Sequence, residues 1–111
     1  MKTDEKSMAL VDLLSKIEKR EAVVGIIGLG YVGLPMAIHF GKKGFRVIGF
    51  DVDVRKIDML LRGESYIKHI RMEQVNEKIK EGSLEVTFDF NRLREADCIL
   101  ICVPTPLTDK M

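Results

Sequence analysis

The apolar residues of this chain follow two different spacings, one typical of strands and one typical of helices. Short apolar runs predict strands of a parallel sheet, and a segment in which apolar and polar residues alternate predicts a strand with one wetter face. The predicted strands span residues 22–28, 45–51, 84–88 and 97–103. Apolar residues at helical spacing predict helices before and between the strands, at residues 4–20, 31–43, 54–62, 71–81 and 89–95.

Residues that favour helix ends stand at several of these boundaries. Asp53 and Asp89 precede predicted helices, where an N-cap side chain accepts a backbone N–H. Gly44, Gly63 and Gly82 follow predicted helices, where a left-handed glycine ends the last turn. The local signals therefore agree with the periodicity.

Strands that alternate with helices and are joined by right-handed crossovers predict an α/β fold. We expect a Rossmann-type doubly wound parallel sheet, partial because it has four strands, with strand order 3-2-1-4. The predicted helix in residues 1–20 precedes the first strand, so we expect an extra element laid on this unit. Residues 21–111 would form the domain itself.

The segment that joins the first strand to the next helix reads Gly28-Leu29-Gly30-Tyr31-Val32-Gly33, and Asp51 ends the second strand. In a dinucleotide-binding turn, the first glycine allows a tight turn, the second lets the backbone approach a pyrophosphate, and the third lets the helix lie close to the strand. The N-terminus of that helix then faces the phosphates. The order of strand, glycines, helix and acid therefore predicts a dinucleotide site, the alternative being a glycine-rich turn without a ligand.

The acid at the end of the second strand indicates which dinucleotide binds. The Asp51 carboxylate can accept hydrogen bonds from both adenosine-ribose hydroxyls and would repel a 2′-phosphate, so NAD is favoured over NADP. Arg55 and Lys56 are close enough in sequence to weaken this preference. No Lys or Arg occurs between Gly25 and Phe40, so backbone N–H groups would hold the phosphates.

A second loop reaches the same edge of the predicted sheet. Pro104-Thr105-Pro106 ends the fourth strand abruptly, and the carboxyl ends of the first and fourth strands flank the switch point where a ligand binds in such sheets. We expect the Thr105 hydroxyl to face the cofactor, or the prolines simply to end the strand.

The composition of the 111 residues narrows the function classes. Lys and Arg (18) nearly balance Asp and Glu (17), which gives no indication of nucleic-acid or anionic-membrane binding. The longest uncharged stretch contains glycines and a proline, and the N-terminal segment is charged, so we expect neither a transmembrane helix nor a signal peptide. A cytoplasmic protein is the default expectation.

The cysteines and histidines do not form a catalytic or metal-binding pattern. Cys98 and Cys102 would lie about 13 Å apart along an extended strand, too far for a disulfide, and we expect buried core thiols. They lack the spacing of zinc ligands, so no metal site is predicted. His39 lies in a predicted helix and His69 in a charged segment, where a structural or solvated role is commoner than a catalytic one.

Two motifs together resemble the UDP-glucose/GDP-mannose dehydrogenase family: Gly28-Leu-Gly-Tyr-Val-Gly-Leu-Pro35 and Cys102-Val-Pro-Thr-Pro-Leu107. The N-terminal helix and the segment Gly63-Glu-Ser-Tyr-Ile67 are most similar to the branch that acts on UDP-N-acetylglucosamine or its relatives. The resemblance covers about residues 13–107.

The resemblance implies an NAD-dependent oxidation of the C6 hydroxyl of a UDP-sugar to a carboxylate, with two NAD consumed and an aldehyde held on a catalytic Cys. It assigns NAD binding to Gly28, Leu29, Gly30, Tyr31, Val32, Gly33, Asp51, Lys56, Val103, Pro104, Thr105 and Pro106. Tyr31 would lie beside the pyrophosphate or nicotinamide, or it would only pack the loop. The full-length enzyme would be a homo-oligomer.

Family members are roughly four times as long, and their catalytic Cys, Lys, Asn and Asp lie in later segments. We therefore expect this chain to be the N-terminal part of a longer dehydrogenase, which binds NAD and has no catalytic residue of its own. The alternatives are a non-catalytic NAD(H)-binding sensor module and another dehydrogenase class with the same opening, such as a hydroxyacid dehydrogenase.

Overall fold

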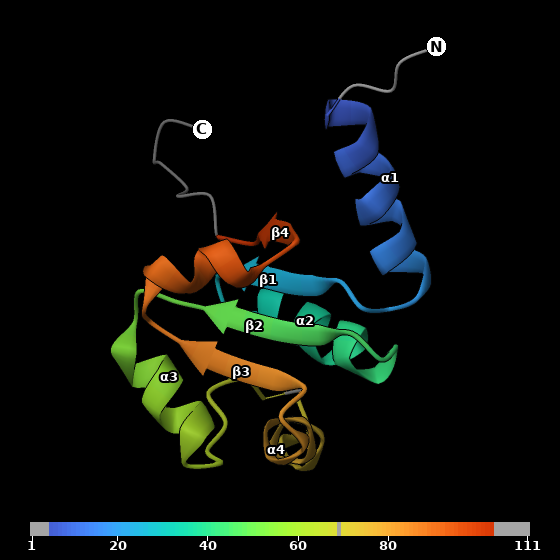
Figure 1. Cartoon of the computed structure of the whole chain (residues 1–111). Coiled ribbons are helices and arrows are strands. Elements are labelled where there is room, and N and C mark those ends of the chain that lie inside the picture. Colours follow the sequence, from blue (N-terminus) through green and yellow to red (C-terminus); the bar gives the residue numbers. More distant parts are fainter. Residues whose placement is uncertain (1–4, 69, 104–111) are drawn as a thin grey trace, which may run out of the picture.

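A computed structural model describes residues 5–68 and 70–103. Parallel strands β1 (Val23–Ile27), β2 (Arg46–Phe50), β3 (Leu84–Thr87) and β4 (Cys98–Ile101) form one sheet of order β3-β2-β1-β4. The predicted α/β class and strand order 3-2-1-4 are confirmed. The helices are α1 (Glu5–Glu18), α2 (Gly33–Lys42), α3 (Val54–Leu61), α4 (Met72–Glu81) and the 3₁₀ helix η1 (Phe90–Glu95) (Figure 1).

The predicted helix ends are mostly confirmed. The Asp53 carboxylate accepts the N–H of Arg55 at the start of α3, and the Asp89 carboxylate accepts the N–H of Asn91 at the start of η1. Gly44, Gly63 and Gly82 all have positive φ just after a helix. Local sequence chemistry therefore sets where these elements start and stop.

The main core lies between one face of the sheet and helices α2, α3 and α4. It is a single cluster of buried apolar residues: Val24, Ile26, Leu29, Leu34, Ala37, Ile38, Val47, Ile57, Leu60, Ile67, Val75, Leu84 and Val86. Met72 and Ile79 of α4 pack against it. This core fixes the crossover helices, and thereby the loops at the carboxyl edge of the sheet.

The opposite face of the sheet is covered mainly by η1. Phe50 and Ile48 are fully buried there, and the ring of Phe50 lies 5.6 Å from that of Phe90. The Arg92 guanidinium donates hydrogen bonds to the carboxylates of Glu85 and Glu95, which ties η1 to β3.

The fourth strand is not buried on both faces, which corrects the expectation from its apolar sequence. Ile99 and Ile101 are 46% and 70% exposed, while Cys98 and Leu100, on the other face, are partly buried. The reason is that η1 covers the β2 part of this face and leaves the side chains of β4 open. Phe88 is also exposed, because β3 ends at Thr87.

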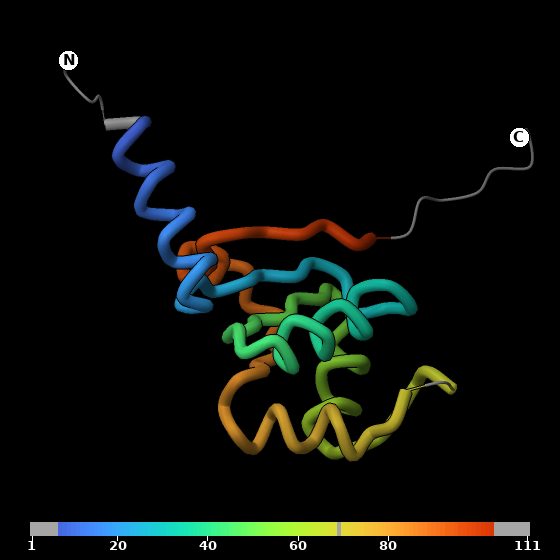
Figure 2. The backbone as a smooth tube through the Cα atoms, turned by 90° about the vertical axis from the view of Figure 1, so that its right-hand side faces the viewer, coloured from blue at the N-terminus to red at the C-terminus, as the bar shows by residue number. Residues whose placement is uncertain are grey.

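Helix α1 is not laid on the domain, which corrects a second expectation. It projects away from the sheet (Figures 1 and 2), and its apolar residues Met8, Leu10, Val11, Leu14 and Ile17 are exposed. A polar contact joins its base to the domain: the Lys16 ammonium lies 3.3 Å from the Asp97 carboxylate. Among the helices of residues 5–68 and 70–103, none is long and apolar enough to span a membrane.

Asp97 joins α1 to the start of the sheet. Its carboxylate accepts the N–H of Val23 at 2.8 Å and contacts Lys16, and its own N–H donates to the Val23 carbonyl at 2.8 Å. The hydrogen bond from Val23, followed by the one from Lys16, holds the pKa of Asp97 below its ordinary value. Asp97 therefore stabilises the folded state in its charged form.

We expect the Asp97→Asn substitution to flatten the acid dependence of folding. A carboxylate with a lowered folded-state pKa contributes stability above its unfolded pKa of about 4, and this contribution is lost as the pH falls through the lower folded value. Urea unfolding from pH 6 down to pH 2 should thus show a smaller loss of stability in Asp97→Asn than in the parent chain. Asp58→Asn, at an exposed position, is the control, and equal pH slopes for all three proteins would contradict the prediction.

Candidate functional site

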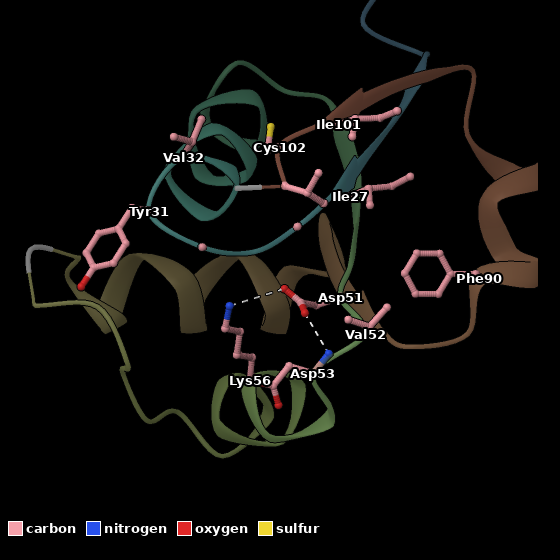
Figure 3. Close-up of a pocket in the computed structure, with 13 residues that line it drawn as sticks. Ile27, Tyr31, Val32, Asp51, Val52, Asp53, Lys56, Phe90, Ile101 and Cys102 are labelled. Carbon is pink, nitrogen blue, oxygen red and sulfur yellow. Dashed lines mark hydrogen bonds and ion pairs between the residues drawn. The ribbon is translucent and has the colours of Figure 1, made fainter. Parts of the chain in front are cut away.

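A pocket of about 740 Å³ opens at the carboxyl edge of the sheet, beside the ends of β1, β2 and β4 (Figure 3). The strand ends, the glycine loop and the start of α3 all contribute to it. Its lining residues are Ile27, Gly28, Gly30, Tyr31, Val32, Asp51, Val52, Asp53, Lys56, Phe90, Ile101, Cys102 and Val103. This position is where ligands bind in open α/β sheets.

The three motif glycines differ in how much space surrounds the position of an added Cβ. Gly28 has φ +97°, and a Cβ there would lie 2.7 Å from the Cys102 carbonyl oxygen. A Cβ on Gly33 would lie 1.6 Å from the Gly28 carbonyl oxygen, so only glycine lets α2 start so close to β1. Gly30 has ordinary φ and no atom within 4 Å of an added Cβ, so the space beside it is open to a ligand.

The N-terminus of α2 borders this pocket and has no side-chain cap. Val32 is the N-cap residue, and the first turn contains no acidic residue. Within residues 5–68 and 70–103, the backbone N–H groups of Tyr31, Val32 and Gly33 donate to no backbone carbonyl outside the helix. Free N–H groups and the positive end of the helix dipole form a site suited to phosphate.

Asp51 is 7% exposed and faces the pocket from the end of β2. One carboxylate oxygen, Oδ2, accepts the N–H of Leu29 at 2.9 Å, and the other, Oδ1, accepts the N–H of Asp53 at 2.8 Å. A carboxylate has about four lone-pair positions, so acceptor capacity remains for ribose hydroxyls. Lys56 Nζ lies 3.9 Å from Oδ2, as the dashed line in Figure 3 shows.

A second carboxylate, that of Asp53, lies at the mouth of the same pocket. The hydrogen bond from Arg55 holds its pKa below the ordinary value. Each of the two carboxylates has a cation beside it: Lys56 Nζ lies 3.9 Å from Asp51 Oδ2, and Arg55 Nε lies 3.3 Å from Asp53 Oδ1.

Seven of the residues predicted for cofactor binding come together around the pocket: Gly28, Gly30, Tyr31, Val32, Asp51, Lys56 and Val103. Gly33 and Leu29 do not line it. Leu29 is fully buried in the core, and its N–H donates a hydrogen bond to Asp51. Leu29 therefore anchors the glycine loop to the core instead of lining the pocket. Pro104, Thr105 and Pro106 lie outside the described residues, and their roles stay predictions.

Sequence reasoning missed several apolar pocket residues. Val52 is 82% exposed and directly follows Asp51, and Phe90 reaches the pocket from η1. Val52 directly follows Asp51 in the sequence, and this position could have indicated that its side chain lines the pocket. No local pattern indicates Phe90, because its position depends on how η1 lies over the sheet.

The cysteines are less buried than expected. Cys98 and Cys102 are free thiols of intermediate exposure, so the prediction of buried thiols is wrong. Cys102 follows β4 and lines the pocket. It packs against the main core, on the same face of the sheet as Leu100.

The residues present fit a dinucleotide. The pocket combines an open glycine, free helix N–H groups for a pyrophosphate, and a buried carboxylate with remaining acceptor positions for a ribose. Apolar side chains of Val52, Phe90 and Ile101 supply walls for a ring.

Comparison with known proteins gives the same result. A family model described as the UDP-glucose/GDP-mannose dehydrogenase family, NAD binding domain, matches residues 22–111. The UDP-N-acetyl-D-glucosamine 6-dehydrogenase of Salmonella typhi is 39% identical over 88 residues, which are 78% of this chain and 20% of that protein.

Solved structures agree with this match. A ternary complex of GDP-mannose dehydrogenase from Pseudomonas aeruginosa has a TM-score of 0.72 and 36% identity, covering 78% of this chain and 20% of that one. The UDP-D-ManNAc dehydrogenase of Pyrococcus horikoshii has a TM-score of 0.73 and 33% identity, covering 78% and 21%. The chain thus spans about a fifth of the length of these proteins.

Two glycines of the motif should respond differently to the same substitution. We expect Gly33→Ala to destabilise the fold severely, because its Cβ would overlap a backbone carbonyl that has no room to move. Gly30→Ala should leave the melting temperature almost unchanged, because its Cβ meets open space and its φ is not positive. Thermal unfolding of both variants checks this, and a Gly33→Ala variant as stable as the parent would contradict the observed packing.

Proposed function

Because the chain belongs to the UDP-glucose/GDP-mannose dehydrogenase family, as its NAD-binding domain, we propose that it is the cofactor-holding part of a nucleotide-sugar 6-dehydrogenase. The proposed reaction oxidises the C6 hydroxyl of UDP-N-acetylglucosamine, or a similar UDP-sugar, to a carboxylate. NAD is the hydride acceptor in both oxidation steps. The complete enzyme is proposed to be a cytoplasmic homo-oligomer.

The observation that carries this proposal is the pairing of an open glycine loop with a buried acid across one pocket. In the proposed complex, the N–H groups at the start of α2 hold the pyrophosphate, next to the open side of Gly30. The Asp51 carboxylate accepts from the adenosine ribose through the lone pairs that Leu29 and Asp53 leave free. Lys56 is close enough to Asp51 to help hold that carboxylate in place.

The identity of the nucleotide sugar is the most specific part of the proposal. The similar proteins are named for UDP-N-acetylglucosamine, GDP-mannose and UDP-N-acetylmannosamine, at 39%, 36% and 33% identity. These values differ little, so the choice of UDP-N-acetylglucosamine rests on the resemblance of the Ser65-Tyr66-Ile67 segment to that branch.

This chain is proposed to bind the cofactor without performing the oxidation. Among the described residues, no hydrogen bond or ion pair joins Cys98 or Cys102 to a His or Lys that would activate a thiolate. Such a partner is what a catalytic thiol needs.

A non-catalytic sensor of NAD(H) is the second candidate, and one observation favours it. The exposed Ile99 and Ile101 of β4 and the apolar residues of α1 form surfaces that a partner protein would cover. In the dehydrogenase proposal, further parts of the enzyme would cover the same surfaces. The oxidation assay below separates the two once it is applied to the full gene product.

Substitution of the ribose acid should weaken NAD binding. We expect Asp51→Ala to cost about 1–3 kcal/mol of NAD binding free energy, the scale of hydrogen bonds to a charged group. Asp51 also holds the glycine loop in place, so its loss could weaken binding through the loop alone. Gly30→Ala is the complementary variant, because its fold is expected to persist while the added Cβ occupies the space proposed for the pyrophosphate. Calorimetric titration with NAD measures both.

Asp58→Ala is the matched control, since it removes an exposed carboxylate of α3 that pairs with Arg62 and does not line the pocket. An NAD dissociation constant that is unchanged in both Asp51→Ala and Gly30→Ala would remove this pocket from cofactor binding.

The 111-residue chain alone should not oxidise a nucleotide sugar. We expect no NADH fluorescence when the purified chain is mixed with NAD and UDP-N-acetylglucosamine, under conditions where calorimetry shows NAD bound. UDP-sugar-dependent NADH formation by this chain would show that it contains its own catalytic residues and would overturn this part of the proposal.

A further inference from the structure

The backbone at Leu29, in the middle of the glycine loop, is held from two sides by side chains. Its N–H donates to Asp51 Oδ2 at 2.9 Å, and its carbonyl accepts from the Tyr66 hydroxyl at 2.5 Å. Its side chain is fully buried against Gly49, where an added Cβ would lie 2.7 Å from Leu29 Cδ2. Leu29 is thus fixed by its side chain and by both of its backbone polar groups.

The two side chains that hold Leu29 are linked to each other through Lys56. Lys56 Nζ lies 3.9 Å from Asp51 Oδ2 and 5.8 Å from the centroid of the Tyr66 ring, within reach of a cation–π contact. These contacts form a closed cycle that passes through Asp51, Leu29, Tyr66 and Lys56. The cycle connects the glycine loop to the end of β2, to α3 and to the segment between α3 and α4.

The segment around Tyr66 is built to hold that hydroxyl in place. The Ser65 hydroxyl donates to the Ile67 carbonyl at 2.6 Å and accepts the Ile67 N–H at 3.1 Å, which forms a tight turn. Ile67 is 4% exposed and belongs to the main core. Ser65 and Ile67 thus fix the direction in which Tyr66 leaves the chain.

The Tyr66 hydroxyl keeps its proton near neutral pH and can donate it in a hydrogen bond. Burial, and then the negative charges of Asp51 and Asp53, raise its pKa well above the ordinary value. The hydrogen bond to Leu29 therefore does not depend on pH near neutrality.

Fixing the Leu29 carbonyl also fixes the next N–H along the chain. A peptide unit is planar, so the Leu29 carbonyl and the Gly30 N–H cannot rotate independently. The bond from Leu29 N–H to Asp51 fixes the preceding unit in the same way. The orientations of two successive peptide planes before Gly30 are thereby fixed. This matters because Gly30 has no side chain that would restrict its own backbone dihedral angles.

We propose that Tyr66 is a positioning residue for the dinucleotide pyrophosphate, because its hydroxyl orients the Leu29–Gly30 peptide unit before the ligand binds. This inference rests on the proposed binding of NAD in the same pocket. A loop that is already in its bound conformation loses less conformational entropy on binding, which raises affinity. The gain applies to ligands that contact the loop through a pyrophosphate.

The test compares ligands with and without a pyrophosphate. In Tyr66→Phe, which keeps the ring beneath Lys56, we expect the affinities for NAD and ADP to fall about three- to tenfold, the effect of one hydrogen bond. The affinity for adenosine should stay unchanged. Amide hydrogen exchange in the free protein should become faster at Leu29 and Gly30.

Ser83→Ala is the matched control, because the Ser83 hydroxyl also donates to a backbone carbonyl, that of Lys78 at 3.2 Å, and Ser83 does not line the pocket. It should leave both the NAD and adenosine affinities unchanged. All titrations are made at a temperature where circular dichroism shows each variant folded.

Two results would overturn the inference, and they are distinguishable. If Tyr66→Phe lowers the melting temperature but leaves the ratio of NAD to adenosine affinity unchanged, the hydroxyl is only structural, and the cofactor role of the pocket stands. If the parent chain itself binds neither NAD nor ADP, the proposed cofactor role fails and the inference fails with it.

Discussion

The contact between the start of α2 and the end of β1 is the constraint on which the rest of the site depends. Gly33 lies so close to the Gly28 carbonyl that no side chain fits between them. This approach aims the free N–H groups of α2 along the edge of the sheet, directly over the pocket. It also turns Leu29 inward, where it fills the space above Gly49 and joins the core. Core packing and ligand geometry are therefore set by the same few atoms.

The electrostatics of the pocket follow from this backbone arrangement. Helix N–H groups carry the positive potential for an anion, so the loop has no need of a cationic side chain. Lys56, which lines the pocket, is placed beside Asp51 instead. Asp51 in turn accepts two backbone N–H groups, one from Leu29 in the glycine loop and one from Asp53. A buried carboxylate is tolerated here because its oxygens are hydrogen-bonded.

The sequence predicted the parts of the fold that depend on local spacing and on general chirality. Strand positions, their order and most helix ends follow from apolar periodicity, right-handed crossovers and residues such as Asp53 and Gly82. It also predicted the acid and the glycines at the carboxyl edge. It did not predict that Ile101 is exposed or that α1 stands away from the sheet, because these depend on what neighbouring elements cover. For the same reason, the hydrogen bond from Tyr66 to a residue 37 positions away has no local signature.

The open face of β4 has a consequence for how the protein behaves in concentrated solution. Ile99, Ile101 and Val103 present an apolar strip beside the outer edge of β4, which pairs with no further strand among the described residues. A second molecule can add to such a surface. A net charge of only +1 at pH 7 provides little long-range repulsion to oppose such encounters. Colloidal stability should therefore improve in buffers away from neutral pH, where the molecules carry more charge of one sign. The strand has only four residues, which limits how far such stacking could propagate.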